Sequence, residues 1–380
     1  MNEDKATRYH RLRRRGTALA LCVRVGLCGG VLALGVSPAV RTVIERLIMP
    51  LGLPWPIQTA LGVGLFALAL GVVAETLAFP FVWHTWYFLD RRYGLSQESF
   101  IDWLHGYAKT LFLGLAFWVT AAAVVYLAIA GWPEAWWVVA WAAFVAVTVA
   151  VTKLGPVVVL PWLYTIKPLR RKELKRRLEV LARRAGAPLV GVDEWHLGDR
   201  ALKVNAALIG LGSTRRVLLS DTLLTDYSDD EVEAVLAHEL AHHVNRDIWK
   251  TMAYEVGVVL CAFWVAARIL VLLVPTLGLH GVSDIAGLPL LALSVGGVVL
   301  LSSPLSKLLS RHHERRADQY AVELTGNRDA LVSGLRRIGS QNLAEEHPSW
   351  LVECLFYTHP PLSKRVAAAR GLVGASVDYR

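Results

Sequence analysis

Residues 108–131 read AKTLFLGLAFWVTAAAVVYLAIAG, an apolar stretch in which Lys109 is the only charged side chain. A helix needs about 20 apolar residues to cross the hydrocarbon core of a bilayer. The same criterion is met by five other stretches, at about 16–37, 57–83, 135–162, 252–275 and 285–305. The sequence therefore predicts a mainly α, polytopic transmembrane helical bundle.

The overall composition agrees with an integral membrane protein. The 380 residues are 54% hydrophobic and only 19% charged, with a formal net charge of +9. Such a chain is too apolar for a soluble globular protein. Its Lys and Arg residues cluster beside the apolar stretches, which favours contacts with anionic lipid headgroups and not with nucleic acid.

Basic residues also predict the orientation, because they concentrate on the cytoplasmic side of membrane spans. The N-terminal tail carries Lys5, Arg8, Arg11, Arg13, Arg14 and Arg15. Six crossings from a cytoplasmic N-terminus place 84–107, 163–251 and the C-terminal tail inside. The outside connections near 131–135 and 276–284 contain no Lys or Arg, and only Arg41 and Arg46 disagree.

Four regions follow from this topology. They are an N-terminal membrane region of about four helices (1–162), a cytoplasmic segment (163–251), two further spans (252–305) and a C-terminal helical segment (306–380). Short runs at 190–197, 203–209 and 214–220, separated by turn-forming glycines, predict a small antiparallel sheet in the cytoplasmic segment. The stretch Ser228-Asp229-Asp230-Glu231 is typical of a capping box that begins a helix.

The capped helix carries His238-Glu239-Leu240-Ala241-His242. Residues four apart share one helix face, so His238 and His242 are spaced to bind one Zn²⁺. Glu239 points about 100° away from His238 and can act on a water activated by the ion without being a ligand. This pattern is typical of zinc peptidases in which the glutamate is the general base.

A catalytic zinc needs a third protein ligand. Glu314 is a candidate, with Asp318 one turn later on the same face to accept a hydrogen bond from a ligand imidazole. His312 and His313 are alternative ligands by their chemistry, whereas His243 points away from the expected zinc face. Taken alone, the charged run around Glu314 is more typical of a surface helix than of a metal ligand.

These motifs resemble the type I CAAX prenyl endopeptidase family. The resemblance extends from about residue 57 to 370. It is carried by Ala234–His242, by Glu314-x-x-Ala317-Asp318, by Phe79-Pro80 with Gly94–Gln97, by Asn205-Ala206 with Arg215–Leu224, and by His359–Leu362 with Arg365.

The resemblance implies a role for each matching residue. His238, His242 and Glu314 match the ligands of one zinc ion, Glu239 matches the catalytic glutamate, and Asp318 matches a residue that supports the site. His359 and Arg365 match residues that contact the substrate and stabilise the oxyanion, and Asn205 lies on the strand that pairs with extended substrate. The implied fold is a membrane bundle with a cytoplasmic zincin-like catalytic domain that contains the small sheet.

The sequence also departs from the family pattern. Eukaryotic members have seven spans around a large chamber, so the amphipathic stretch 303–313 is a candidate for the seventh. Ala241 stands where glycine is usual. The basic composition rich in Ala, Leu and Arg favours a bacterial member in the inner membrane, where prenylated substrates are in doubt.

The expected activity is hydrolysis of a peptide or protein substrate, prenylated or membrane-inserted, near the cytoplasmic membrane face. There are three alternatives to this activity. They are a quality-control peptidase of the heat-shock type, a catalytically inactive relative that binds membrane proteins, and a transporter with a structural zinc site. The intact motif residues oppose the second, and the third is disfavoured because the polar groups cluster outside the spans.

Overall fold

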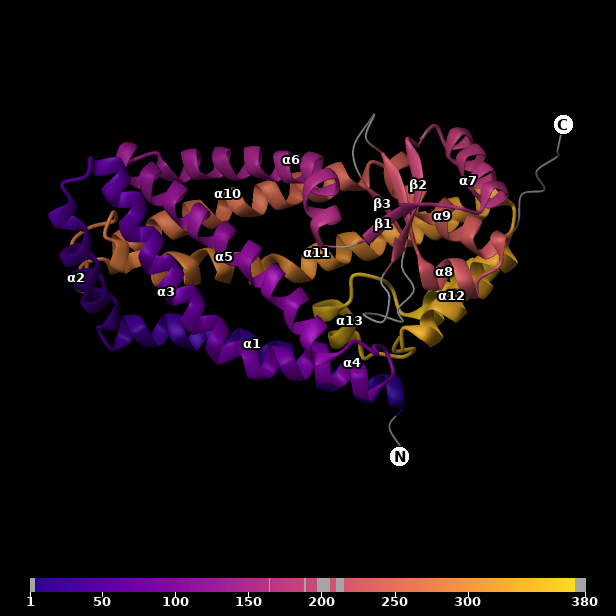
Figure 1. Cartoon of the computed structure of the whole chain (residues 1–380), viewed down its shortest axis with the longest axis horizontal. Helices are drawn as coiled ribbons and strands as arrows, with labels where there is room; N and C mark the ends of the chain where they lie inside the picture. Colours follow the sequence, from indigo (N-terminus) through magenta and orange to yellow (C-terminus); the bar gives the residue numbers. More distant parts are fainter. Residues whose placement is uncertain (1–3, 164, 188, 197–205, 210–214, 373–380) are drawn as a thin grey trace.

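The computed structural model describes residues 4–163, 165–187, 189–196, 206–209 and 215–372. Figure 1 shows its elements, which in chain order are α1 (Lys5–Ala33), α2 (Val36–Ile48), η1 (Met49–Leu51), α3 (Trp55–Trp83), η2 (His84–Phe88), α4 (Leu89–Arg92), α5 (Phe100–Gly131), α6 (Trp136–Leu163), β1 (Thr165–Pro168), α7 (Lys172–Arg184), β2 (Gly191–His196), β3 (Ala206–Ile209), β4 (Arg216–Ser220), α8 (Asp221–Asp226), α9 (Asp229–Val244), α10 (Asp247–Leu273), η5 (Ile285–Gly287), α11 (Leu288–Thr325), α12 (Arg328–Gln341), α13 (Trp350–Phe356) and α14 (Leu362–Gly371).

A bundle of long helices forms one end of the molecule, and the sheet with its shorter helices forms the other (Figure 1). Within the described residues, six helices are long and apolar enough to cross a membrane, which confirms the predicted spans. They pack in a closed ring in the order α1, α3, α5, α6, α10 and α11, with α11 returning to α1. Both ends of the chain lie towards the end that holds the sheet (Figure 1).

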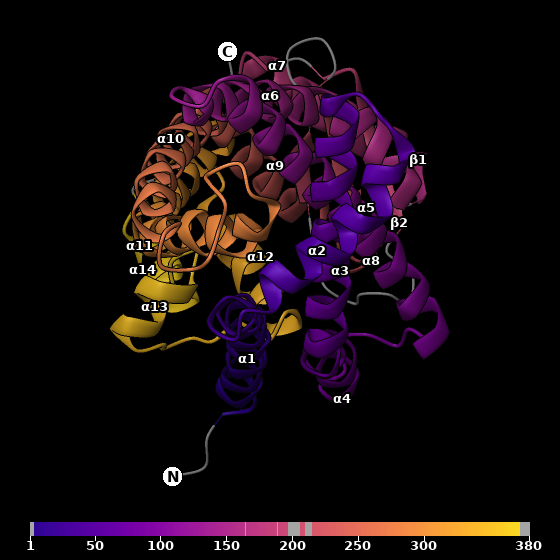
Figure 2. The same ribbon diagram turned by 90° about the vertical axis from the view of Figure 1, so that its left-hand side faces the viewer.

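Helix α2 lies across the far end of the bundle, in the segment expected to be an outside loop (Figure 2). Its Arg41 is buried and forms an ion pair with Asp284, which precedes α11. Ser37 adds a 2.5 Å hydrogen bond to the carbonyl of Ala286. The ion pair neutralises the charge of Arg41 inside the fold, which accounts for an arginine in a segment that the charge rule expects to lie outside.

The arginine in the first span has a partner as well. Both Nε and Nη2 of Arg24 donate to the carboxylate of Glu75 on α3, at 2.9 and 3.0 Å. A two-point pair of this kind satisfies both charges away from water. It explains how α1 keeps a cation within an apolar stretch.

The sheet has four strands in the order β1-β2-β4-β3. Strands β1 and β2 pair antiparallel, as do β3 and β4, but β2 and β4 pair parallel. The expectation of an antiparallel sheet is therefore wrong for its central pair. Successive strands do alternate in direction, but β4 lies between β2 and β3, so β2 has a neighbour that runs the same way. Strand periodicity carries no information about this order.

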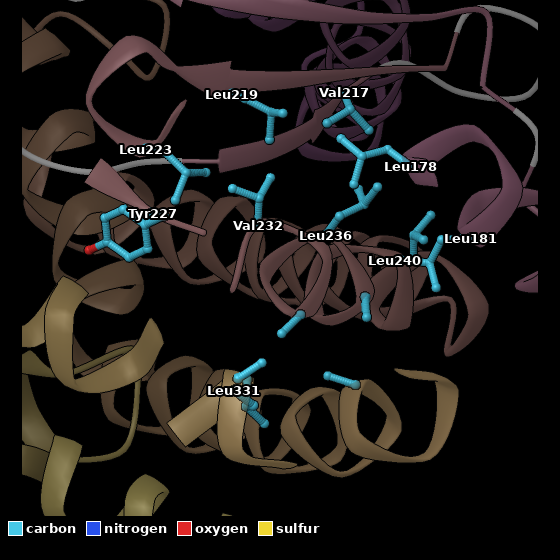
Figure 3. Packing of buried hydrophobic residues seen from close by; sticks show 14 of the residues in the cluster. Leu178, Leu181, Val217, Leu219, Leu223, Tyr227, Val232, Leu236, Leu240 and Leu331 are labelled. Atoms are coloured by element: carbon cyan, nitrogen blue, oxygen red, sulfur yellow. The ribbon is translucent and has the colours of Figure 1, made fainter. Parts of the chain in front are cut away.

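Helix α9 lies in the core between the sheet and α12 (Figure 3). Val232, Leu236 and Leu240 recur every four residues and are fully buried against β4 and α7. Full burial of one such side chain contributes about 1.5–3 kcal/mol. Replacing Leu236 with alanine would cost about 2–5 kcal/mol, because the well-packed core would not close over the cavity.

The start of α9 is fixed by the predicted capping box. The Ser228 side chain accepts from the Glu231 backbone N–H, and the Glu231 carboxylate accepts from the Ser228 backbone N–H. The Ser333 hydroxyl donates a further hydrogen bond, 2.5 Å long, to the Glu231 carboxylate and so connects α12 to α9. These contacts set the rotation of the helix that carries the two histidines.

Helix α11 is continuous over 38 residues, with Pro304 inside it. The stretch 303–313 is therefore part of the sixth span's own helix, and a separate seventh span at this position is wrong. The expected boundary between 305 and 306 also lies inside this helix. One rigid element thus connects the membrane bundle to Glu314 and Asp318.

Candidate active site

Helix α9 presents His238 and His242 on the face that meets α11. The two rings are 5.1 Å apart at their centroids and nearly perpendicular. His238 is buried, and the side chain of His242 is 28% exposed. Their Nε2 atoms point to the same carboxylate on the neighbouring helix.

That carboxylate belongs to Glu314, which is buried. Its two oxygens lie 3.3 Å from Nε2 of His238 and 3.4 Å from Nε2 of His242. One ligand atom from each of the three residues falls within 4.8 Å of the others. We call His238, His242 and Glu314 the metal triad.

The polar atoms of the triad fit a cation. Oε2 of Glu314 is buried and has no aligned hydrogen-bond donor among the described residues, although Nδ1 of His359 lies 2.7 Å away. Burial lowers the pKa of His238, but contacts with Asp318 and Glu314 outweigh this and raise the pKa to about 10. The surplus negative charge around the imidazoles is of the kind that a bound metal ion neutralises.

Each histidine of the triad has a carboxylate behind it. Nδ1 of His238 lies 3.0 Å from the Asp318 carboxylate on α11, close but not aligned for a hydrogen bond. Nδ1 of His242 lies 3.1 Å from Asp247, at the start of α10. Such partners fix the proton on Nδ1 and leave Nε2 free to bind a metal. Asp247 is a residue that sequence reasoning missed; in the sequence it is marked only as an acidic residue five positions after the second histidine.

Two residues of the C-terminal segment reach the triad. Arg365 on α14 makes a two-point ion pair with Asp318, at 2.8 and 2.7 Å, and lies 3.6 Å from Glu314. His359 approaches Glu314 from the loop before α14, and its side chain is 59% exposed. Arg365 is therefore held in place, while His359 faces open space.

Glu239 lies next to the triad in a cavity of about 370 Å³ that also includes His238, His359 and Arg365. Burial raises the pKa of its carboxyl group, and the neighbouring histidines oppose that rise. A carboxylate whose proton affinity is increased in this way is suited to accept a proton from water.

The other sequence candidates lie elsewhere. His313 is buried with its Nε2 3.6 Å from Asp247, and His312 is exposed. Among the described residues, the group able to hold a metal is the metal triad, and it does not include His312, His313 or His243. Asn205 lies outside the described residues.

Two family models match the chain. The model "Peptidase family M48" matches residues 168–373, and the model "CAAX prenyl protease N-terminal, five membrane helices" matches residues 2–165. Over the second range the described structure has four spanning helices and the 13-residue α2.

Individual relatives agree with these matches. An uncharacterized metalloprotease, YhfN of Bacillus subtilis (strain 168), is 27% identical over 343 residues, covering 89% of this chain and 78% of that protein. Probable CAAX prenyl protease 1 of Schizosaccharomyces pombe is 24% identical over 307 residues, covering 80% and 64%.

The crystal structure of S. mikatae Ste24p has a TM-score of 0.82 at 21% identity and covers 96% of this chain and 88% of that one, so the fold is shared. Together with the family matches, this confirms the resemblance to CAAX prenyl proteases. The chain belongs to peptidase family M48 and is a multi-pass membrane metalloprotease that acts on a peptide or protein substrate.

Proposed function

We propose that the metal is zinc, one ion per chain, held by His238, His242 and Glu314, and that the enzyme cleaves peptide bonds at the cytoplasmic membrane face. The observation that most supports this is the convergence of two Nε2 atoms and one carboxylate beside Glu239. Two histidines and one glutamate form a common ligand set of catalytic zinc, which keeps a fourth position open. When bound, the ion would polarise the scissile carbonyl and acidify the attacking water.

Glu239 carries out the proton transfers. Its carboxylate accepts a proton from the attacking water and passes it to the leaving amine. Because Glu239 follows His238 directly on α9, it lies beside the ligand face without being part of it.

His359 and Arg365 are assigned different tasks. His359 faces the cavity and is positioned to donate a hydrogen bond to the oxygen on which negative charge develops. Arg365 holds Asp318, which in turn orients His238, while its charge adds to the positive potential at the oxyanion.

An extended substrate would lie along β3. This strand is at the edge of the described sheet, and its Ala206 lines the cavity. A peptide added to that edge would gain main-chain hydrogen bonds independent of its sequence. Asn205, directly before β3, would contribute to this binding.

The substrate class follows from the link between the membrane and the site. Helix α11 carries both an apolar span and two residues of the site, so a single helix connects the membrane bundle to the metal triad. We infer that the substrate is itself prenylated or membrane-inserted, and that the surrounding bilayer is that of a bacterial inner membrane.

The test is cleavage, in detergent, of a farnesylated C-terminal CaaX peptide beside its unprenylated twin. Cleavage restricted to the prenylated peptide, and absent in Glu239→Gln, would support a CAAX-type substrate. Equal cleavage of both would retain the peptidase and indicate general turnover of membrane proteins. Cleavage of neither by the zinc-loaded enzyme would contradict the proposed activity and favour an inactive relative.

A further inference from the structure

Helix α1 continues beyond its apolar span and reaches the catalytic cavity. It is one unbroken helix, so residues 5–15, which precede the apolar stretch, extend it towards the end of the molecule that holds the sheet (Figure 1). His10 on this extension lines the same cavity as Glu239 and His359. The first membrane helix thus forms part of the wall of the candidate active site.

One turn after His10, Arg14 contacts a buried carboxylate. Its Nη1 lies 2.7 Å from Oε2 of Glu345, a residue that is only 5% exposed. The hydroxyl of Tyr357 donates to the same oxygen at 2.5 Å, and Arg14 also donates to this hydroxyl at 3.3 Å. We call Arg14, Glu345 and Tyr357 the α1 anchor. A buried carboxylate needs such donors, because losing one leaves its charge without compensation.

A second contact holds the turn that precedes Glu345. Nε2 of His10 donates to the carbonyl of Leu343 at 2.8 Å. Leu343 has a φ of 50°, a left-handed conformation that leucine rarely adopts. Its side chain packs against a small apolar cluster that includes Tyr9 of α1 and Leu89 of α4. Contacts with α1 and α4 therefore stabilise an unfavourable turn.

The anchored part of the chain leads to His359. We call residues 342–361 the His359 segment; it begins directly after α12, includes α13 and ends directly before α14. His359 lies two residues after Tyr357, and its side chain is 59% exposed. Because few neighbours enclose this ring, the backbone of the segment determines where it lies.

The basic residues of the α1 extension have a simpler explanation, as signals for the orientation of the helix in the membrane. That explanation treats Arg14 and Arg15 alike. The structure distinguishes them, since Arg15 is exposed whereas Arg14 is half-buried and paired with Glu345. Orientation alone does not account for the contacts of Arg14.

We propose that Arg14 is a positioning residue for His359 and acts through Glu345 and Tyr357. Arg14 neutralises the buried carboxylate, which holds the Tyr357 side chain and so fixes the backbone that places His359 at the cavity. Arg14 does not itself line the cavity, so it acts without contact with the reacting atoms. This inference rests on the proposed function, in which His359 stabilises the oxyanion.

The first test measures the mobility of the His359 segment and does not depend on activity. Full-length wild type, Arg14→Gln and Arg15→Gln are compared in detergent by hydrogen–deuterium exchange with mass spectrometry. Arg14→Gln should increase amide exchange in the segment by about tenfold, the effect of losing a hydrogen bond to a charged group. Exchange in α9 should stay unchanged. Arg15→Gln removes the same charge and should match the wild type throughout.

Kinetics then test the connection to catalysis, on the CaaX peptide that the wild type cleaves. Arg14→Gln should lower kcat about 10- to 100-fold, because small displacements of a positioned group are costly. KM and zinc content should be unchanged, and Arg14→Lys should restore part of the loss by keeping a cation at Glu345. In a His359→Ala background, Arg14→Gln should have little further effect on kcat.

The double variant Arg14→Gln/Glu345→Gln removes both charges, so no buried carboxylate is left unpaired. It should show the same loss of kcat and keeps the test valid where the single variant does not fold. If Arg14→Gln matches Arg15→Gln in exchange and in kcat, or if its effect is fully additive with that of His359→Ala, the inference is overturned while the proposed function stands. If the wild type cleaves no peptide, the proposed function fails, and the exchange measurement alone decides whether Arg14 orders the segment.

Discussion

Each imidazole of the metal triad is supported by a carboxylate from a neighbouring helix. Asp318 lies behind His238, and Asp247 lies behind His242. Asp247 is itself buried and also contacts Lys250 at 3.2 Å. A ligand imidazole that loses such a partner can rotate and loses basicity.

Replacing Asp247 with asparagine should therefore weaken metal binding by about 10- to 100-fold, as is usual for partners of this kind. Competition with a chelator of known affinity measures the change in the purified protein. Asp329→Asn is the control, since that side chain is 89% exposed on α12. Unchanged metal affinity in Asp247→Asn would show that His242 does not depend on this carboxylate.

At the scale of elements, α11 also determines where the loop with His359 lies. Arg311 is one turn before Glu314 and is buried. Its Nη1 donates to the carbonyls of Glu353 and Tyr357, at 2.8 and 2.7 Å, and so fixes the end of α13. His359 follows two residues after the second of these anchors.

Arg311→Gln should misplace His359 and lower kcat by about 10- to 100-fold, because small displacements of a positioned group are costly. Metal content should be unchanged. In a double-mutant cycle, the same substitution should have little further effect on kcat in a His359→Ala background. Full additivity of the two effects would contradict the connection.

The capping box of α9 makes stability depend on pH. Burial raises the pKa of Glu231, but hydrogen bonds from Ser333 and Ser228 outweigh it and hold the pKa below its usual 4.5. A carboxylate with a lowered pKa stabilises the folded state above about pH 4.5, and this contribution is lost as the pH falls and the group is protonated.

Glu231→Gln should therefore lower the unfolding temperature at pH 7 and flatten its decrease between pH 5 and pH 3. Thermal unfolding in detergent, followed by circular dichroism, measures both effects. Glu173→Gln on α7 is the control, because that side chain is 79% exposed. An unchanged pH profile in the Glu231 variant would contradict the role of the capping box.

At the scale of the whole molecule, the ring of six helices places both chain ends on the side of the sheet (Figure 1). We predict that this side is cytoplasmic. Reporter domains fused to the N-terminus and to the C-terminus should both be active only if they function in the cytoplasm. A periplasmic reporter active at either end would contradict the orientation.

Much of this architecture could be predicted from the sequence. The spans could be found because bilayer thickness sets the length of an apolar run such as 108–131. The triad could be found because His238 and His242 are local on one helix and Glu314 belongs to a second motif. Arg41 and Asp284 are brought together only by tertiary packing and left no periodic signal. The position of β4 between β2 and β3 depends on such packing too. Asp247 follows His242 by only five residues, but their contact depends on the turn between α9 and α10 and has no helical spacing.

The central claim is that the triad holds the metal while Glu239 moves the proton. The most direct test measures zinc content and peptide cleavage together, in purified wild type, Glu239→Gln and Glu314→Gln. Wild type should contain one zinc per chain. Glu239→Gln should keep the zinc and lose about 100- to 10,000-fold in kcat, whereas Glu314→Gln should lose both. Full zinc in Glu314→Gln, or unimpaired cleavage by Glu239→Gln, would contradict this account.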